Sequence, residues 1–110
     1  MDSYKIIITP DAENDLLELR NYINEVLRSR ETAKRYIHTI RTEIGSLSKI
    51  PARYKPVDDE PWHSRGIRRI IVKNFFVYYR IDEEQKMVFI LNVIYARRNQ
   101  LRMLEQMKFN

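Results

Sequence analysis

Residues 66–95 read GIRRIIVKNFFVYYRIDEEQKMVFILNVIY. This segment contains three runs rich in β-branched and aromatic residues, which favour strands, at positions 67–72, 75–81 and 87–95. The polar segments between the runs, 73–74 and 82–85, are short enough for hairpin turns. The pattern therefore predicts an antiparallel meander of three strands.

The residues before this segment have a different period. Positions 4–9 form a short apolar run that predicts one more strand, and Thr9-Pro10 is typical of a helix start. Apolar residues then recur every three or four positions in two segments, which predicts two amphipathic helices. The first set comprises Ala12, Leu16, Leu19, Ile23 and Val26. The second set comprises Ala33, Ile37, Ile40, Ile44 and Leu47.

The links between these elements indicate how they are arranged. Ser29 is a candidate cap for the second helix, and the link at 28–30 is short enough to make the helices antiparallel neighbours. The second helix should end near Ile50, because Pro51 disfavours helical geometry in the residue before it. Residues 51–66 contain three prolines and Gly66 and read as a loop, whereas 96–109 reads as a short closing helix.

The predicted fold class is therefore α+β. We expect an N-terminal strand and an antiparallel helical hairpin that packs on a mainly antiparallel four-stranded sheet, followed by a short C-terminal helix. The length of 110 residues suits one domain, and we assign residues 1–110 to it.

The composition restricts the possible functions. The absence of cysteine excludes disulfide scaffolds, thiolate metal sites and cysteine nucleophiles, and it fits a reducing compartment. Two glycines cannot form a phosphate-binding glycine loop. No apolar run approaches the roughly 18 residues that a membrane span needs. We therefore expect a cytoplasmic protein that binds no metal, cofactor or membrane.

The charge is distributed unevenly along the chain. The total of +5 combines 10 basic and 11 acidic residues in 1–60 with 10 basic and 4 acidic residues in 61–110. The first part thus carries −1 and the second +6. An excess of this kind indicates an anionic partner for the second half of the chain.

Arginines and aromatic residues are interleaved in this basic half. Arg68 and Arg69 are consecutive on one predicted strand, so their side chains must point to opposite faces. Tyr95 ends the last strand, just before further arginines. The basic residues that we expect to converge on one open sheet face are Lys73, Arg80, Arg97, Arg98 and Arg102. Cations that follow phosphates, beside aromatic faces that stack on bases, are typical of a nucleic-acid surface.

Other readings of these residues stay open. The basic face can serve as an electrostatic binding surface without catalysis, and about half of the strand aromatics should belong to the core. Trp62 is interpreted as a plug over the sheet edge or as a stacking platform, and His63 as a candidate acid–base group. Asp58, Asp59 and Glu60 are interpreted as a solvated acidic loop, with cation binding as the alternative.

Several motifs, in this order and spacing, give the chain a family resemblance. They are Ala12-Glu13-Asn14-Asp15-Leu16, Tyr22-Ile23, Ala33-Lys34-Arg35-Tyr36-Ile37, Gly66-Ile67-Arg68-Arg69, Phe76-Val77-Tyr78-Tyr79-Arg80-Ile81 and Val93-Ile94-Tyr95-Ala96-Arg97-Arg98. Together they cover nearly the whole chain, which resembles the RelE/ParE superfamily of bacterial toxins. The resemblance implies the toxin of a type II toxin–antitoxin pair, blocked by an antitoxin that wraps around it.

The resemblance also implies two possible targets. One branch of the superfamily cleaves mRNA on the ribosome without a metal, whereas the ParE branch inhibits DNA gyrase. The leading hypothesis from the sequence is ribosome-dependent mRNA cleavage, that is, an endoribonuclease; a gyrase inhibitor without nuclease activity and a non-toxic RNA- or protein-binding module are the alternatives. An acidic antitoxin segment is expected to cover the basic sheet face.

The resemblance assigns roles to particular positions. The basic position on the first late strand is Arg68 or Arg69, and the one after the last strand is Arg97 or Arg98. For mRNA cleavage, the candidate catalytic residues, which would stabilise phosphorane charge, are Arg68, Arg69 and Arg97. The candidate RNA-binding residues are Lys73, Arg80, Arg98, Arg102 and Tyr95.

Overall fold

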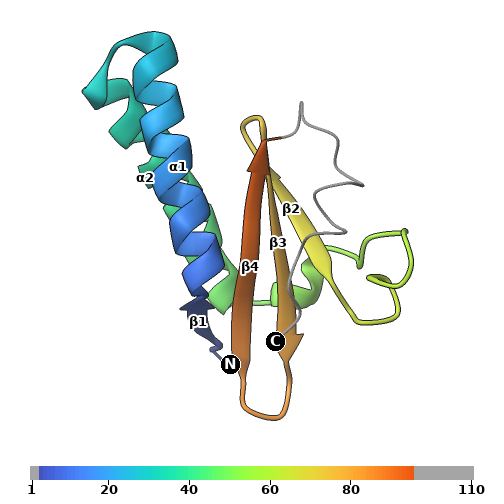
Figure 1. The fold of residues 1–110 in the computed structure, drawn as a ribbon. Helices are drawn as coiled ribbons and strands as arrows, with labels where there is room; N and C mark the ends of the chain where they lie inside the picture. Colours follow the sequence, from blue (N-terminus) through green and yellow to red (C-terminus); the bar gives the residue numbers. More distant parts are fainter. Residues whose placement is uncertain (1–2, 96–110) are drawn as a thin grey trace.

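The computed structural model describes residues 3–95, in which a strand, two helices and three further strands follow one another (Figure 1). The predicted C-terminal helix lies outside the described residues. The helices and strands are β1 (Lys5–Ile8), α1 (Pro10–Leu27), α2 (Arg30–Gly45), β2 (Arg68–Val72), β3 (Phe75–Asp82) and β4 (Met87–Tyr95). Two short 3-10 helices, Ser46–Ser48 and Pro51–Arg53, connect α2 to the long loop before β2.

Both helices begin where the sequence predicts. The Ala12 N–H donates to Thr9 Oγ1 over 3.3 Å, and the Thr32 N–H donates to Ser29 Oγ over 3.1 Å. Each cap satisfies a backbone donor that has no partner within the helix. The end of α2 differs from the prediction, because the α-helix stops at Gly45 and tightens into a 3-10 turn.

The four strands form one sheet in the order β1-β4-β3-β2. β1 runs parallel to β4, while β4, β3 and β2 form the predicted antiparallel meander. Lys73 and Asn74 make the first turn, and Lys73 has a left-handed φ of 57°. The second turn covers 83–86 instead of 82–85, because Asp82 still pairs with Met87.

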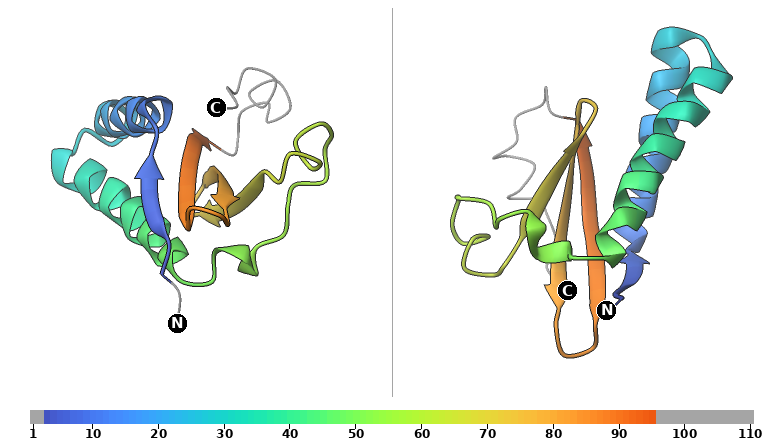
Figure 2. Two further views of the ribbon diagram at one scale, coloured as in Figure 1. Left: turned by 90° about the horizontal axis from the view of Figure 1, so that it is seen from below. Right: turned by 180° about the vertical axis from the view of Figure 1, so that it is seen from behind.

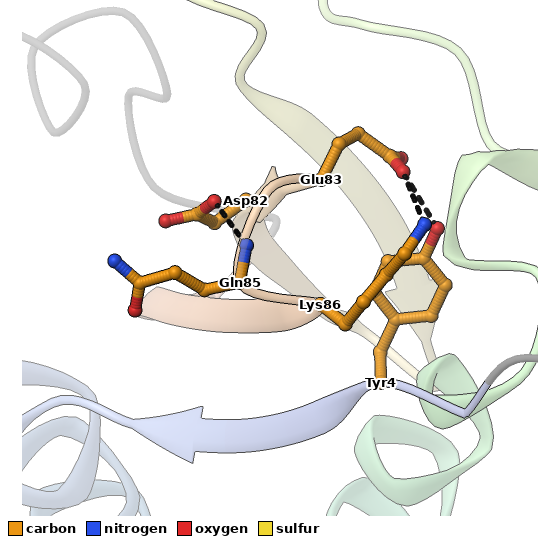
Figure 3. A network of polar contacts seen from close by, with 5 residues as sticks. All are labelled: Tyr4, Asp82, Glu83, Gln85 and Lys86. Atoms are coloured by element: carbon orange, nitrogen blue, oxygen red, sulfur yellow. Dashed lines mark hydrogen bonds and ion pairs between the residues drawn. The ribbon is translucent and has the colours of Figure 1, made fainter.

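The turn between β3 and β4 is tied to the start of β1 (Figure 3). The Tyr4 hydroxyl donates to Glu83 Oε2 over 2.7 Å, and Lys86 Nζ lies 3.4 Å from the same oxygen. The hydrogen bond to Glu83 raises the pKa of Tyr4. Within the turn, the Gln85 N–H donates to Asp82 Oδ1 over 3.0 Å. These contacts join the parallel strand to the meander at one end of the sheet.

The helical hairpin covers one face of the sheet, and the later part of the loop before β2, from Val57 onward, packs on the other face (Figure 2). The predicted helix stripes are buried against the sheet except for Val26, which is 59% exposed. Val26 lies near the tip of the hairpin, where the helices diverge from the sheet (Figure 1). The second face has a smaller core whose members are Val57, Trp62, Ile67, Tyr78, Leu91 and Ile94. Trp62 is 5% exposed, so it belongs to this core and is not an exposed stacking platform.

Candidate functional site

Arg68 and Arg69 lie on opposite faces of the sheet, as their consecutive positions on β2 predict. Arg68 pairs in register with Tyr79, which belongs to the core under the helices. Arg69 pairs with Tyr78, which belongs to the second core. The two arginines therefore face different surroundings and cannot bind the same phosphate group.

The Arg68 side chain holds the loop that precedes β2. Its Nη1 donates to the Tyr54 carbonyl oxygen over 2.5 Å and lies 3.4 Å from the Ala52 carbonyl oxygen. Next to it, the buried Tyr79 hydroxyl donates to the Pro51 carbonyl oxygen over 2.7 Å. Burial raises the pKa of Tyr79 to about 12, so its hydroxyl stays protonated at neutral pH. Both side chains thus bind backbone carbonyls of residues 51–54.

Arg69 and Arg80 share the face that points away from the helices. The Arg69 guanidinium carbon lies 4.4 Å from the centroid of the Phe76 ring, and that of Arg80 lies 4.4 Å from the Phe89 ring. Both contacts are cation–π interactions, which position a guanidinium without neutralising it. Tyr78 is paired with Arg69 across β2 and β3, and it precedes Arg80 by two residues on β3. Burial raises the pKa of Tyr78, and the neighbouring Arg69 partly offsets this effect.

A cleft of about 430 Å³ opens beside Arg69 along β2, which is an edge strand of the sheet. Ile71 lines this cleft and is 62% exposed. Its other lining residues come from the loop and are Tyr54, Lys55, Pro56, Val57, Asp58 and Asp59. The cleft therefore combines charges of both signs with an exposed aliphatic side chain, and of its lining residues Arg69 and Tyr54 are of the types enriched in protein interfaces.

Lys73 lies on the other side of the sheet from Arg80. Its Nζ is 5.5 Å from the centroid of the Tyr36 ring on α2, in a cleft of about 280 Å³ that Arg35 also lines. The predicted convergence of Lys73 and Arg80 on one face is therefore wrong. Lys73 belongs to the turn after β2, and this turn approaches the helices instead of the open face.

Tyr95 also lies on the helix side of the sheet. Its ring centroid is 5.3 Å from that of Phe75 and 6.2 Å from that of Tyr22. These rings line an apolar groove of about 230 Å³ between the hairpin tip and the sheet. The remaining lining residues are Ile23, Val26, Leu27, Tyr36 and Asn74. The exposed Val26 and Leu27 make the groove a surface that can accept apolar side chains.

Sequence reasoning missed this groove and the structural role of Arg68. The exposure of Val26 depends on where the hairpin leaves the sheet, and the contacts of Arg68 depend on how the loop returns to β2. The spacing of apolar residues in α1 predicts neither the exposure of Val26 nor the contacts of Arg68. Three of the candidate basic residues, Arg97, Arg98 and Arg102, lie outside the described residues.

The described part of the chain gives three further observations. Within residues 3–95, no three His, Asp or Glu side chains are close enough together to hold a metal ion. His63 Nδ1 lies 2.8 Å from the Val57 carbonyl oxygen, so this ring is tied to the loop backbone. In the same residues, no helix combines the length and the apolar character that crossing a membrane requires.

Comparison with known families identifies the chain. The family model described as "ParE toxin of type II toxin-antitoxin system, parDE" matches residues 6–100. The chain belongs to the ParE toxin family. It is therefore a toxin of the RelE/ParE superfamily, from a type II toxin–antitoxin system. Among curated proteins, none matches the sequence of this ParE-family toxin.

Solved structures share the fold of this ParE-family toxin. A chain of the chromosomal ParDE toxin–antitoxin system from P. aeruginosa is similar with a TM-score of 0.71 at 19% identity, over 86% of this chain and 98% of that one. A chain of the RelBE2 toxin–antitoxin complex from Mycobacterium tuberculosis gives 0.58 at 26% identity, over 84% and 98%. A mutant of E. coli RelE toxin in the free state gives 0.60 at 11% identity, over 94% and 97%.

Proposed function

We propose that this ParE-family toxin arrests growth by binding and inhibiting DNA gyrase, and that it does so without cleaving RNA. The main support for the absence of RNA cleavage is that the side chains of Arg68 and Tyr79 already donate hydrogen bonds to backbone carbonyls of residues 51–54. The ParE family match over residues 6–100 supports the proposal independently.

The chemistry of RNA cleavage explains why this observation matters. Attack by a 2′-hydroxyl requires one group that accepts its proton and another that donates a proton to the leaving oxygen. Arg68 stays protonated, and its guanidinium already donates to a carbonyl oxygen. The raised pKa values of Tyr78 and Tyr79 make both hydroxyls poor proton-transfer groups at neutral pH. These strands are therefore better suited to binding a partner than to catalysis.

The partner-binding surface that we propose for gyrase contains Arg69, Arg80 and the cleft beside β2. The two guanidiniums rest on Phe76 and Phe89, and Ile71 adds an exposed apolar contact. Arginine and aromatic side chains, which pack against each other here, are both enriched in protein interfaces. The cleft volume of about 430 Å³ is sufficient for several side chains of a partner.

Ribosome-dependent mRNA cleavage is the second candidate, with Arg69 and Arg97 as its catalytic residues. Arg68, which was also predicted for this role, lies on the opposite face of the sheet and binds the loop backbone. The observation in its favour is that Arg69 and Arg80 lie on one face, above aromatic rings, where they can contact a phosphate backbone. The RelBE2 chain, at 26% identity, also belongs to a toxin–antitoxin complex. Of the residues predicted to bind RNA, Arg80 lies on this face, and Arg98 and Arg102 would add to it, whereas Lys73 and Tyr95 lie on the helix side of the sheet.

We further propose that a cognate antitoxin blocks the toxin by inserting apolar side chains into the groove between Val26, Leu27 and Tyr95. The groove presents apolar surface to solvent, and burying it would stabilise a complex by about 25 cal/mol per Å². ParDE and RelBE2, whose toxin chains share this fold, are toxin–antitoxin systems. The acidic segment expected from the sequence would continue over Arg69 and Arg80.

Induction of the toxin in a bacterial host separates the two targets. Gyrase inhibition should arrest growth with relaxed plasmid DNA or trapped DNA breaks, while messages stay intact. Cleavage at codons of translated messages, with normal plasmid supercoiling, would support the ribosome instead. Co-expression of the adjacent small gene should restore growth if its product is the antitoxin. Harmless overexpression of the toxin alone would contradict both targets.

A further inference from the structure

Charge is segregated along the helical hairpin, although residues 1–60 are nearly neutral as a whole. Residues 10–19 of α1 carry four carboxylates and no basic side chain. Residues 20–36, which form the tip, carry five basic and two acidic side chains, a net charge of +3. The turn between α1 and α2 projects beyond the sheet (Figure 1), and Arg30 lies next to it as the first residue of α2.

A cleft of about 350 Å³ lies between the two helices within this basic tip. Helix α1 contributes one arginine and two asparagines, and α2 contributes one arginine, one lysine and an alanine. The lining residues are Arg20, Asn21, Asn24, Arg30, Ala33 and Lys34. Ala33 is buried at the helix contact, whereas the three cations are exposed. No carboxylate lines the cleft.

The cations of this cleft have no partner among the described residues. Within residues 3–95, the side chains of Arg20, Arg30 and Lys34 form no hydrogen bond or ion pair. The opposite end of the hairpin differs, because Arg41 Nη2 lies 2.8 Å from Glu13 Oε1. The positive charge at the tip is therefore available to an external anion.

We propose that this cleft binds the phosphodiester backbone of duplex DNA, and the proposal rests on gyrase being the target because gyrase holds DNA. Arginine, lysine and asparagine side chains are among the usual donors to phosphate oxygens. The three cations of the cleft, which have no carboxylate partner, can each contact one of the successive phosphates of a nucleic-acid backbone. The carboxylates of residues 10–19 repel DNA, so the field orients the hairpin with its tip toward the duplex.

An acidic peptide is the competing ligand, and the lining of the cleft disfavours it. Peptide segments gain most of their affinity by burying a few large side chains in apolar pockets. Ala33 is the one apolar lining residue of this cleft, and it is already buried. Recognition here must therefore be electrostatic and polar, which is how a nucleic-acid backbone is bound without regard to sequence.

The test measures binding of a short, labelled duplex DNA of random sequence to the full chain. Fluorescence anisotropy between about 50 and 200 mM NaCl gives the slope of log K against log salt concentration. Each phosphate contact contributes about 0.9 to this slope. The double variant Arg30→Gln, Lys34→Gln should therefore lower the magnitude of the slope by about 2.

The control variant, Lys5→Gln with Lys49→Gln, removes the same charge from exposed positions away from the tip. It should leave the slope nearly unchanged, and thermal unfolding should show that both double variants are folded. Equal losses in the two variants, or no loss in the first, would overturn the proposal. So would tighter binding of single-stranded RNA or of polyglutamate than of the duplex.

A supercoiling assay with the same variants separates this inference from the proposed function. If the wild-type toxin inhibits gyrase and the Arg30→Gln, Lys34→Gln variant retains both inhibition and the full salt slope, the DNA site is wrong while the gyrase target stands. If the wild-type toxin leaves gyrase active but the slope falls as expected, the DNA site stands and the gyrase target is wrong.

Discussion

The Asp15 carboxylate of α1 accepts a hydrogen bond from the backbone N–H of Val93 on β4, over 2.9 Å. β1 pairs with β4 only as far as Ile90, so the edge of β4 beyond that residue lacks a neighbouring strand. Asp15 takes the place of a strand there, and it also accepts from Asn92 Nδ2 over 3.1 Å. This carboxylate therefore adds a polar anchor between the hairpin and the sheet to the apolar contacts of the core.

Asp15 should make the stability of the toxin depend on pH. Burial raises its pKa above the ordinary value of 3.8, against the lowering effect of its hydrogen bonds. The folded state then holds the proton more tightly than the unfolded state, so stability should fall as the pH rises from about 4 through the raised pKa. Urea unfolding at several pH values measures this decrease.

Two variants isolate the role of the carboxylate. Asp15→Asn keeps an acceptor for the Val93 N–H and should remove the pH-dependent decrease. Asp15→Ala leaves that N–H without its partner and should cost about 1–3 kcal/mol of unfolding free energy. A pH profile of Asp15→Asn that matches the wild type would contradict this account of Asp15.

Arg68 and Arg69 should respond differently to truncation. Arg68→Ala removes the donors to the Tyr54 and Ala52 carbonyls and should cost about 1–2 kcal/mol in urea unfolding, after allowance for partial exposure. Arg69→Ala loses a contact with the Phe76 ring, worth about 0.5–1 kcal/mol, and should mainly weaken target inhibition. Equal destabilisation by the two variants would count against the structural role of Arg68.

Tyr79 should ionise late in an alkaline titration. Its pKa is raised to about 12, so a folded protein should show one phenolate that forms well above the ordinary value of 10. Because the unfolded state loses this proton first, stability should fall as the pH rises from 10 toward 12. Ultraviolet difference spectra measure the ionisation. In Tyr79→Phe the late step should disappear, at a cost of about 1–2 kcal/mol for the lost bond to Pro51.

The apolar groove should control antitoxin binding. Val26→Asp places a charge among apolar lining residues and should weaken the complex at least tenfold, which corresponds to about 1.4 kcal/mol. The toxin itself should stay folded, because Val26 is 59% exposed. Ile50→Asp, at a similarly exposed position outside both the groove and the cleft, is the matched control. Calorimetric titration with the antitoxin distinguishes them; equal effects of the two changes would exclude the groove as the main contact.

The fold was predictable because local signals agreed with one another. Thr9 and Ser29 mark the two helix starts, and the change from helical to strand periodicity after Gly66 marks the sheet. The arrangement of the basic residues was not predictable to the same extent. Alternation along β2 separates Arg68 from Arg69, but the placement of Lys73 beside Tyr36 depends on how the sheet twists toward α2.

The groove and the contacts of Arg68 could not be predicted for a related reason. Val26 continues the apolar spacing of α1 and would be buried if the hairpin followed the sheet to its end. Similarly, the Tyr54 carbonyl reaches Arg68 only because the loop pairs with β2 through the bridge between Pro56 and Arg68. Both features depend on long-range packing, and neither leaves a local pattern in the sequence.

Gyrase inhibition is tested by a supercoiling assay with purified toxin and DNA gyrase on relaxed plasmid. We expect loss of supercoiling or accumulation of cleaved plasmid as toxin is added. We also expect the antitoxin to reverse the effect and Arg69→Ala to weaken it. Full gyrase activity at toxin concentrations that cut ribosome-bound mRNA in a translating extract would contradict the proposed gyrase target.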